Sequence, residues 1–142
     1  MESELTKFKV VVIGSQGSGK TSLIASFLQQ KFQEKCKPTE AVKQQAIRVD
    51  LQNMSKAVNL ELWDLPGKES FMILNRMYLR DTNAALIVYD VTSMESYNTA
   101  QKWMDELRES APNDCVWALC GNKMDVTNSH AVSLSDCSKL AG

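Results

Sequence analysis

The sequence predicts an α/β fold in which a mostly parallel sheet is covered by helices on both faces. A short β-branched run at residues 8–13 and apolar runs at 84–89 and 116–120 have the character of buried parallel strands. Segments with apolar residues at helical spacing separate these runs, so strands and helices alternate along the chain. The length of 142 residues suits one domain. We therefore expect a single domain over residues 1–142.

A glycine-rich loop follows the first predicted strand, where residues 14–21 read Gly-Ser-Gln-Gly-Ser-Gly-Lys-Thr. This run satisfies the phosphate-loop pattern G-x-x-x-x-G-K-[ST] between a strand and a helix, a context that disfavours an accidental turn. Its glycines let backbone N–H groups close around a phosphate, and the helix N-terminus favours the same anion. Lys20 can reach the β- and γ-phosphates, and the Thr21 hydroxyl can ligate Mg²⁺.

The segments after this loop predict a helix, a hairpin and a second helix, in that order. Apolar residues recur at helical spacing up to Leu28. Apolar and polar residues then alternate at 47–51 and 58–62 around a polar turn at 52–55, which predicts an antiparallel hairpin. The next helix is predicted over residues 68–82 from the spacing of its apolar positions. These positions are Phe71, Leu74, Met77 and Tyr78.

The last third of the chain predicts a longer helix and a further strand. The helix begins at about Ser93 and ends near Ser110, because Pro112 cannot continue it. Trp103 in this helix and Trp117 in the following strand are expected to be core residues. One last helix is predicted beyond the strand, with Ser133 or Ser135 as its N-cap.

Two further motifs follow predicted strands and so fall at the carboxyl edge of the sheet, where ligands bind in such folds. In the first, Asp64 is suited to hold Mg²⁺ and Gly67 permits close backbone approach to a γ-phosphate. In the second, the Asp125 carboxylate can accept two hydrogen bonds from guanine, and adenine offers no such pair. The Lys123 stem can lie over the purine, and Asn122 can brace the phosphate loop. Each motif alone would be read as an ordinary capped or solvated turn.

In combination, these motifs resemble those of the Ras-superfamily small GTPases, and the Rab branch most of all. Residues 63–69, Trp-Asp-Leu-Pro-Gly-Lys-Glu, resemble the family's W-D-T-A-G-Q-E. Residues 89–92 resemble Y-D-[IV]-T, and residues 121–125 match G-N-K-x-D. The resemblance implies the P-loop NTPase (small G-protein) fold with one antiparallel edge strand. It also implies binding of GTP and GDP with Mg²⁺, hydrolysis of GTP, and a signalling role in membrane or vesicle trafficking.

The resemblance also implies the roles of individual residues. Phe32 packs against the guanine, and Thr39 binds Mg²⁺ and senses the γ-phosphate. Residues 32–41 and 64–80 form two switch segments that bind effectors, exchange factors and activating proteins. The implied metal ligands are Thr21, Thr39 and Asp64, and the implied catalytic residues are Lys20, Thr39, Gly67 and Lys68. The implied nucleotide-binding residues are Ser15, Gln16, Gly17, Ser18, Gly19, Lys20, Thr21, Ser22, Phe32, Thr39, Asp64, Gly67, Asn122, Lys123 and Asp125.

Two departures from the family pattern concern hydrolysis. Lys68 stands where the family has the Gln that orients the attacking water, and an ammonium donates hydrogen bonds but cannot accept them. Gln16 stands where the family prefers a small residue, and its bulk tends to exclude an arginine finger. The hypothesis is a GTPase that hydrolyses GTP slowly. The alternatives are a non-hydrolysing guanine-nucleotide-binding interaction module and, disfavoured by residues 122–125, a P-loop kinase or ATPase.

The family pattern continues past residue 142 with another strand, an S-A-K-type loop and a final helix. For the chain as it stands, we expect exposed apolar surface, reduced stability and weaker guanine affinity than a full-length member has. The chain is either part of a longer protein or lacks the lipid anchor that a C-terminal prenylated cysteine would supply.

Composition predicts an ordinary cytoplasmic protein. The net charge is −1 with 23% charged residues, which gives no basic field for nucleic acid. The four cysteines lack metal-ligand spacing and follow no signal peptide, so reduced thiols are expected. No apolar run is long enough to cross a membrane. We expect a monomer, peripheral to membranes only in a longer prenylated form.

Overall fold

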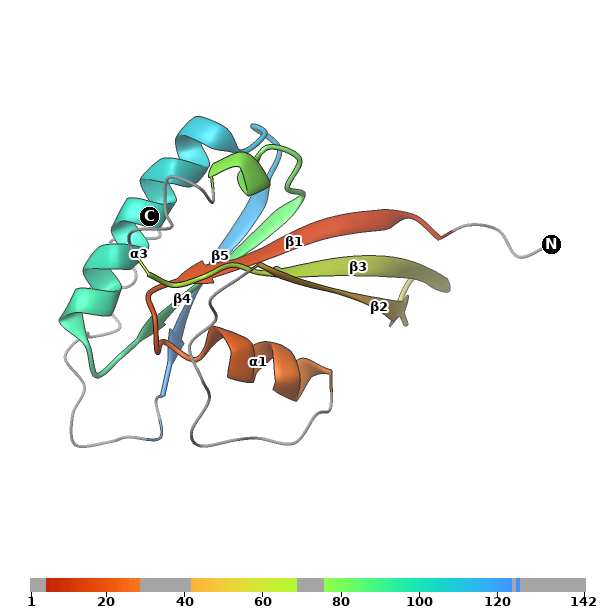
Figure 1. Cartoon of the computed structure of the whole chain (residues 1–142). Coiled ribbons are helices and arrows are strands. Elements are labelled where there is room, and N and C mark those ends of the chain that lie inside the picture. Colours follow the sequence, from red (N-terminus) through yellow and green to blue (C-terminus); the bar gives the residue numbers. More distant parts are fainter. Residues whose placement is uncertain (1–4, 29–41, 69–75, 124, 126–142) are drawn as a thin grey trace.

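The computed structural model describes residues 5–28, 42–68, 76–123 and 125. Its centre is a five-stranded sheet with the order β2-β3-β1-β4-β5 (Figure 1). β2 pairs with β3 in antiparallel fashion, and the other neighbouring strands are parallel. This confirms the predicted mostly parallel sheet with one antiparallel edge strand. The strands are β1 (Lys7–Gly14), β2 (Lys43–Leu51), β3 (Lys56–Asp64), β4 (Ala84–Asp90) and β5 (Val116–Asn122).

Helices cover both faces of this sheet, as predicted. α1 (Lys20–Phe27) lies on one face, and α3 (Met94–Ser110) lies on the other together with the short 3-10 helix η2 (Arg76–Leu79) (Figure 1). Alternate residues of β1 point into two separate cores because side chains alternate across a strand. Ile13 packs in the α3-side core with Trp103, whereas Val12 packs with Ile24 of α1. Trp103 is 1% exposed, so its predicted core position is confirmed.

The helix predicted over residues 68–82 is wrong in the parts that the structure describes. Lys68 is not helical, and the only regular element between 76 and 83 is η2. Contacts to β1 and β3 determine this short turn, because Lys9 donates to the Tyr78 carbonyl and the Tyr78 ring lies 5.7 Å from that of Trp63. Residues 69–75 lie outside the described residues. Met77, one of the apolar residues at helical spacing in this predicted helix, is 64% exposed.

Trp117 is also placed differently from its prediction, since it is 36% exposed. It belongs to β5, the strand at one end of the sheet. Among the described residues, no further strand pairs with β5 on its outer side and covers Trp117. The Arg108 guanidinium lies 5.4 Å from the Trp117 ring centroid. Val116 beside it is 71% exposed. The final helix, with Ser133 or Ser135 as its cap, lies outside the described residues.

Candidate functional site

The phosphate-loop segment connects β1 to α1 at the carboxyl edge of the sheet, and two of its glycines could not be replaced without a clash. A Cβ on Gly14 would lie 2.0 Å from the Val88 carbonyl oxygen. Gly19, the N-cap of α1, has a left-handed φ of 97°, and its Cβ would lie 2.1 Å from the Asn122 side-chain nitrogen. Glycine is therefore required here by both space and backbone conformation.

Lys20 is the first residue of α1, and its own ammonium group lies buried against the phosphate loop. The residue is 5% exposed, and its Nζ donates to the Ser15 carbonyl at 2.9 Å. Burial lowers the pKa of Lys20 to about 8, and the nearby Asp64 carboxylate only partly opposes this shift. A buried ammonium is stabilised by an anion close to it. This part of the loop is thus chemically suited to phosphate.

The two described residues predicted to ligate Mg²⁺ lie in direct contact. Thr21 Oγ1 donates to Asp64 Oδ2 at 2.6 Å, and Asp64 is 4% exposed at the end of β3. Hydroxyl and carboxylate oxygens are the hard ligands that Mg²⁺ prefers, and they leave other coordination positions for phosphate oxygens and water. The pair therefore fits Mg²⁺. The third predicted ligand, Thr39, lies outside the described residues, as does Phe32.

Gly67 packs directly on the phosphate loop. Its carbonyl accepts a hydrogen bond from the Gln16 backbone amide at 3.1 Å. A Cβ on Gly67 would lie 2.5 Å from that amide nitrogen and 2.7 Å from Lys20 Nζ. Only glycine allows this close approach. The segment that contains Asp64 and Gly67 therefore contacts the phosphate loop at the point where a phosphate would meet Lys20.

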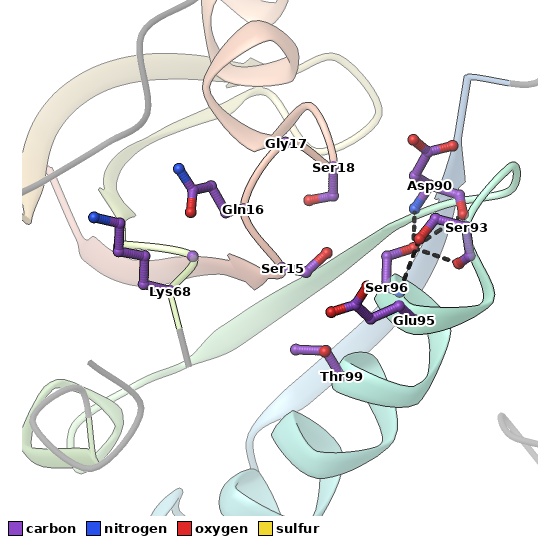
Figure 2. Close-up of a pocket in the computed structure, with 11 residues that line it drawn as sticks. Ser15, Gln16, Gly17, Ser18, Lys68, Asp90, Ser93, Glu95, Ser96 and Thr99 are labelled. Atoms are coloured by element: carbon purple, nitrogen blue, oxygen red, sulfur yellow. Dashed lines mark hydrogen bonds between the residues drawn. The ribbon is translucent and has the colours of Figure 1, made fainter. Parts of the chain in front are cut away.

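A cavity of about 480 Å³ lies between the phosphate loop and the N-terminal turns of α3 (Figure 2). Gln16 and Lys68, the two departures from the family pattern, both line it and both are exposed. The opposite wall comes from residues that sequence reasoning did not assign to the site. They are Asp90, Ser93, Glu95, Ser96 and Thr99.

Asn122 ends β5 and Lys123 follows it, and the side chains of both residues contact the phosphate loop. The Asn122 side-chain amide donates to the Ser18 carbonyl at 2.9 Å. Lys123, in a left-handed conformation with φ of 66°, donates from Nζ to the Gly17 carbonyl at 2.7 Å. Asp125 is exposed in a turn. Ser22 lies in the first turn of α1.

Asp90 joins this arrangement from the end of β4. Its Oδ2 lies 2.9 Å from Lys123 Nζ, and its Oδ1 accepts from the Thr92 backbone amide at 2.8 Å. Burial opposes ionisation, but hydrogen bonds from Thr92 and Lys123 outweigh burial and lower the pKa of Asp90. The Y-D-[IV]-T resemblance contained this residue, yet its spacing alone did not indicate a partner.

The comparisons with known proteins agree with this geometry. The family model described as "Ras family" matches residues 9–142. The chain is 37% identical over 134 residues to the Ras-related protein Rab-4B of Homo sapiens, covering 94% of this chain and 62% of that protein. It is 36% identical over 134 residues to the Ras-related protein Rab-4A of Danio rerio, with coverage of 94% and 62%.

The chain thus spans about 62% of the length of these relatives. Among the described helices, none is long and apolar enough to cross a bilayer. The matched region contains the phosphate loop, Asp64, Gly67 and the 122–125 motif, which begin at the carboxyl ends of β1, β3 and β5 or follow them. The chain therefore belongs to the Ras family and is a Rab-like small GTPase of the Ras superfamily.

Proposed function

We propose that this chain binds GTP and GDP with Mg²⁺ and acts as a slow molecular switch in membrane or vesicle trafficking. The observation that carries the proposal is the contact between Asp64 at the end of β3 and Thr21, beside the buried Lys20, with Gly67 packed against the phosphate loop. Backbone amides and Lys20 would hold the phosphates, and Thr21 and Asp64 would hold the metal ion. The metal would neutralise charge that develops on the phosphates during hydrolysis.

In this proposal, residues 122–125 form the base-reading segment, which selects guanine. Asp125 would accept two hydrogen bonds from guanine, while Lys123 would lie along the purine. Support comes from Asn122 and Lys123, whose side chains bond carbonyls of the phosphate loop and so fix the base-reading segment relative to the phosphates. Effectors, exchange factors and activating proteins would bind segments 32–41 and 64–80. The protein would act as a cytoplasmic monomer.

Hydrolysis is proposed to be slow because of Lys68 and Gln16. An ammonium cannot accept a hydrogen bond from the attacking water, so Lys68 cannot orient water as an amide does. The Gln16 side chain lines the same cavity as Lys68 and occupies space beside the phosphate loop. Both intrinsic and activator-stimulated hydrolysis would be weak, and the loaded protein would remain longer in its GTP form.

Single-turnover hydrolysis of pre-bound GTP tests this proposal. The wild-type protein is compared with Lys68→Gln and with Lys56→Gln, a lysine at the start of β3 that is exposed and distant from the loop. We expect Lys68→Gln to raise the rate by roughly tenfold or more and Lys56→Gln to leave it unchanged. A wild-type rate typical of small GTPases, or no change with Lys68→Gln, would contradict slow hydrolysis.

A second candidate function is an interaction module that binds a guanine nucleotide and does not hydrolyse it. The same two residues, Lys68 and Gln16, favour this candidate. The assay separates the two functions, because the module would retain GTP over many hours without release of phosphate. A measurable rate that depends on Mg²⁺ would exclude the module.

A further inference from the structure

The carboxylate of Asp90 extends from the end of β4, and contacts hold both of its oxygens. Oδ1 accepts from the Thr92 amide at 2.8 Å and from the Thr92 hydroxyl. Oδ2 lies 2.9 Å from the Lys123 ammonium, and the Asp90 side chain is 13% exposed. On the Asp90 side this contact is largely shielded from solvent, and it is a charge-assisted hydrogen bond.

The Lys123 ammonium makes a second bond on the other side. Its Nζ donates to the Gly17 carbonyl at 2.7 Å, so one cation joins Asp90 to the phosphate loop. The backbone of Lys123 has a left-handed φ of 66°, a conformation that non-glycine residues seldom adopt. Its side chain is 40% exposed. Without a partner, so exposed a lysine would have many other rotamers available.

The backbone of Asp90 is held independently of Lys123. Its amide donates to Ser96 Oγ at 2.9 Å, and that hydroxyl lies 2.8 Å from the Ser93 carbonyl at the start of α3 (Figure 2). The next amide, of Val91, donates to the Asn122 carbonyl at 3.0 Å. The backbone from which the carboxylate extends is therefore held by β5 and α3.

We propose that Asp90 is a positioning residue for guanine-nucleotide binding, which holds the Lys123 ammonium against the Gly17 carbonyl and so joins the base-reading segment to the phosphate loop. Lys123 and Gly17 would contact the nucleotide, and Asp90 would act only through them. This inference rests on the proposed function. Losing the Asp90 charge would free Lys123 and shorten the time for which nucleotide stays bound.

The test is the release rate of a fluorescent GDP analogue from the full chain in Mg²⁺. Asp90→Asn keeps an acceptor for Thr92 and removes the charge that faces Lys123. We expect release to be roughly tenfold faster, the typical effect of losing a hydrogen bond to a charged group. Asp50→Asn is the matched control, because Asp50 pairs with Arg48 on the surface, where the two side chains are 74% and 65% exposed. Its release rate should equal that of the wild type.

A double-mutant cycle with Lys123→Met separates positioning from a merely structural role. If Asp90 acts through Lys123, Asp90→Asn changes release less than twofold in the Lys123→Met background. An equal effect in both backgrounds, or wild-type release from Asp90→Asn, overturns the inference. If the wild-type protein binds no guanine nucleotide at all, that result contradicts the proposed function, and this inference is then wrong as well.

A measurement on the unaltered protein covers the case in which Asp90→Asn does not fold. Nitrogen-15 NMR of the GDP-loaded wild-type chain reports how fast each lysine ammonium exchanges its hydrogens with water. We expect slower exchange at Lys123 than at the exposed Lys56, because Asp90 and Gly17 hold the Lys123 ammonium. Equal exchange at the two lysines would overturn the inference.

Discussion

Lys20 carries its charge in surroundings that disfavour it, so the proposed nucleotide binding should depend on pH. Burial lowers the pKa of Lys20 to about 8, whereas phosphate beside the ammonium would raise that pKa again. Binding above this pH must therefore take up a proton. We predict that the affinity for GDP is nearly constant below about pH 7 and falls as pH rises through about 8, by at most about tenfold per pH unit.

Calorimetry in two buffers with different ionisation enthalpies measures this proton uptake directly. We expect uptake approaching one proton at about pH 9 and almost none at about pH 6.5. A buffer-independent enthalpy at the higher pH would show that Lys20 stays charged in the nucleotide-free protein.

Gly19 supports a second prediction at the scale of one residue. Gly19→Ala would place a methyl 2.1 Å from the Asn122 amide nitrogen and force a side chain onto a φ of 97°. Asn122 would then lose its bond to the Ser18 carbonyl. We predict a loss of roughly 2 kcal/mol or more in the free energy of unfolding, and much weaker nucleotide binding. Gly17→Ala is the comparison, since its Cβ would meet no atom within 4 Å and only the φ of 78° opposes it. Chemical denaturation should rank Gly19→Ala as the more damaging change, and the reverse order would contradict the role of Asn122.

At the scale of elements, α3 depends on its N-terminal turn. Ser93 is its N-cap, and the Ser93 hydroxyl accepts from the Ser96 amide at 3.2 Å. We predict that Ser93→Ala lowers the free energy of unfolding by about 1 kcal/mol, because a helix amide loses its partner. Gln101→Ala, at an exposed position of the same helix, should change it by a few tenths of a kcal/mol. Urea denaturation measures both variants, and equal effects would contradict the capping role.

Sequence patterns predicted the strands and the helix whose apolar residues are buried in the core. The apolar runs at 8–13 and 84–89 became β1 and β4, and the helix expected from Ser93 to Ser110 became α3. The hairpin strands are longer than the alternation suggested, because the backbone ladder continues through polar residues such as Lys43, which pairs with Asp64. Residues 76–79 could not be predicted, since η2 depends on contacts of Tyr78 with Lys9 and Trp63 from distant strands.

For the whole molecule, ligand binding should appear as stability. A ligand that binds only the folded state at a hundredfold excess over its dissociation constant contributes about 2.7 kcal/mol. For a domain of this size, we predict that GDP with Mg²⁺ raises the thermal midpoint on the order of 10 °C. Removal of Mg²⁺ with a chelator should reverse much of the shift, because Thr21 and Asp64 would then lose the shared metal. An equal shift with ADP would contradict guanine selectivity.

The candidate site was predictable from local motifs, but the network that connects the motifs was not. The phosphate loop, Asp64 and Gly67 carry recognisable residues, and the structure brings them together at one sheet edge. Asp90 stands in the Y-D-[IV]-T segment, but that segment did not indicate its partners, because Lys123 and Gly17 are distant in sequence and meet only after β1, β4 and β5 pair. Phe32 and Thr39 lie outside the described residues, so their roles stay predictions.

Guanine-nucleotide binding is tested most directly by identifying what the purified protein carries. The protein is purified in Mg²⁺, denatured, and the released nucleotide is identified and quantified by chromatography against the protein concentration. We predict GTP or GDP at close to one molecule per chain, with GTP abundant if the proposed slow hydrolysis holds. ATP or ADP in its place, or no nucleotide from a folded protein, would contradict the assignment of Asp125 and the phosphate loop to a guanine nucleotide.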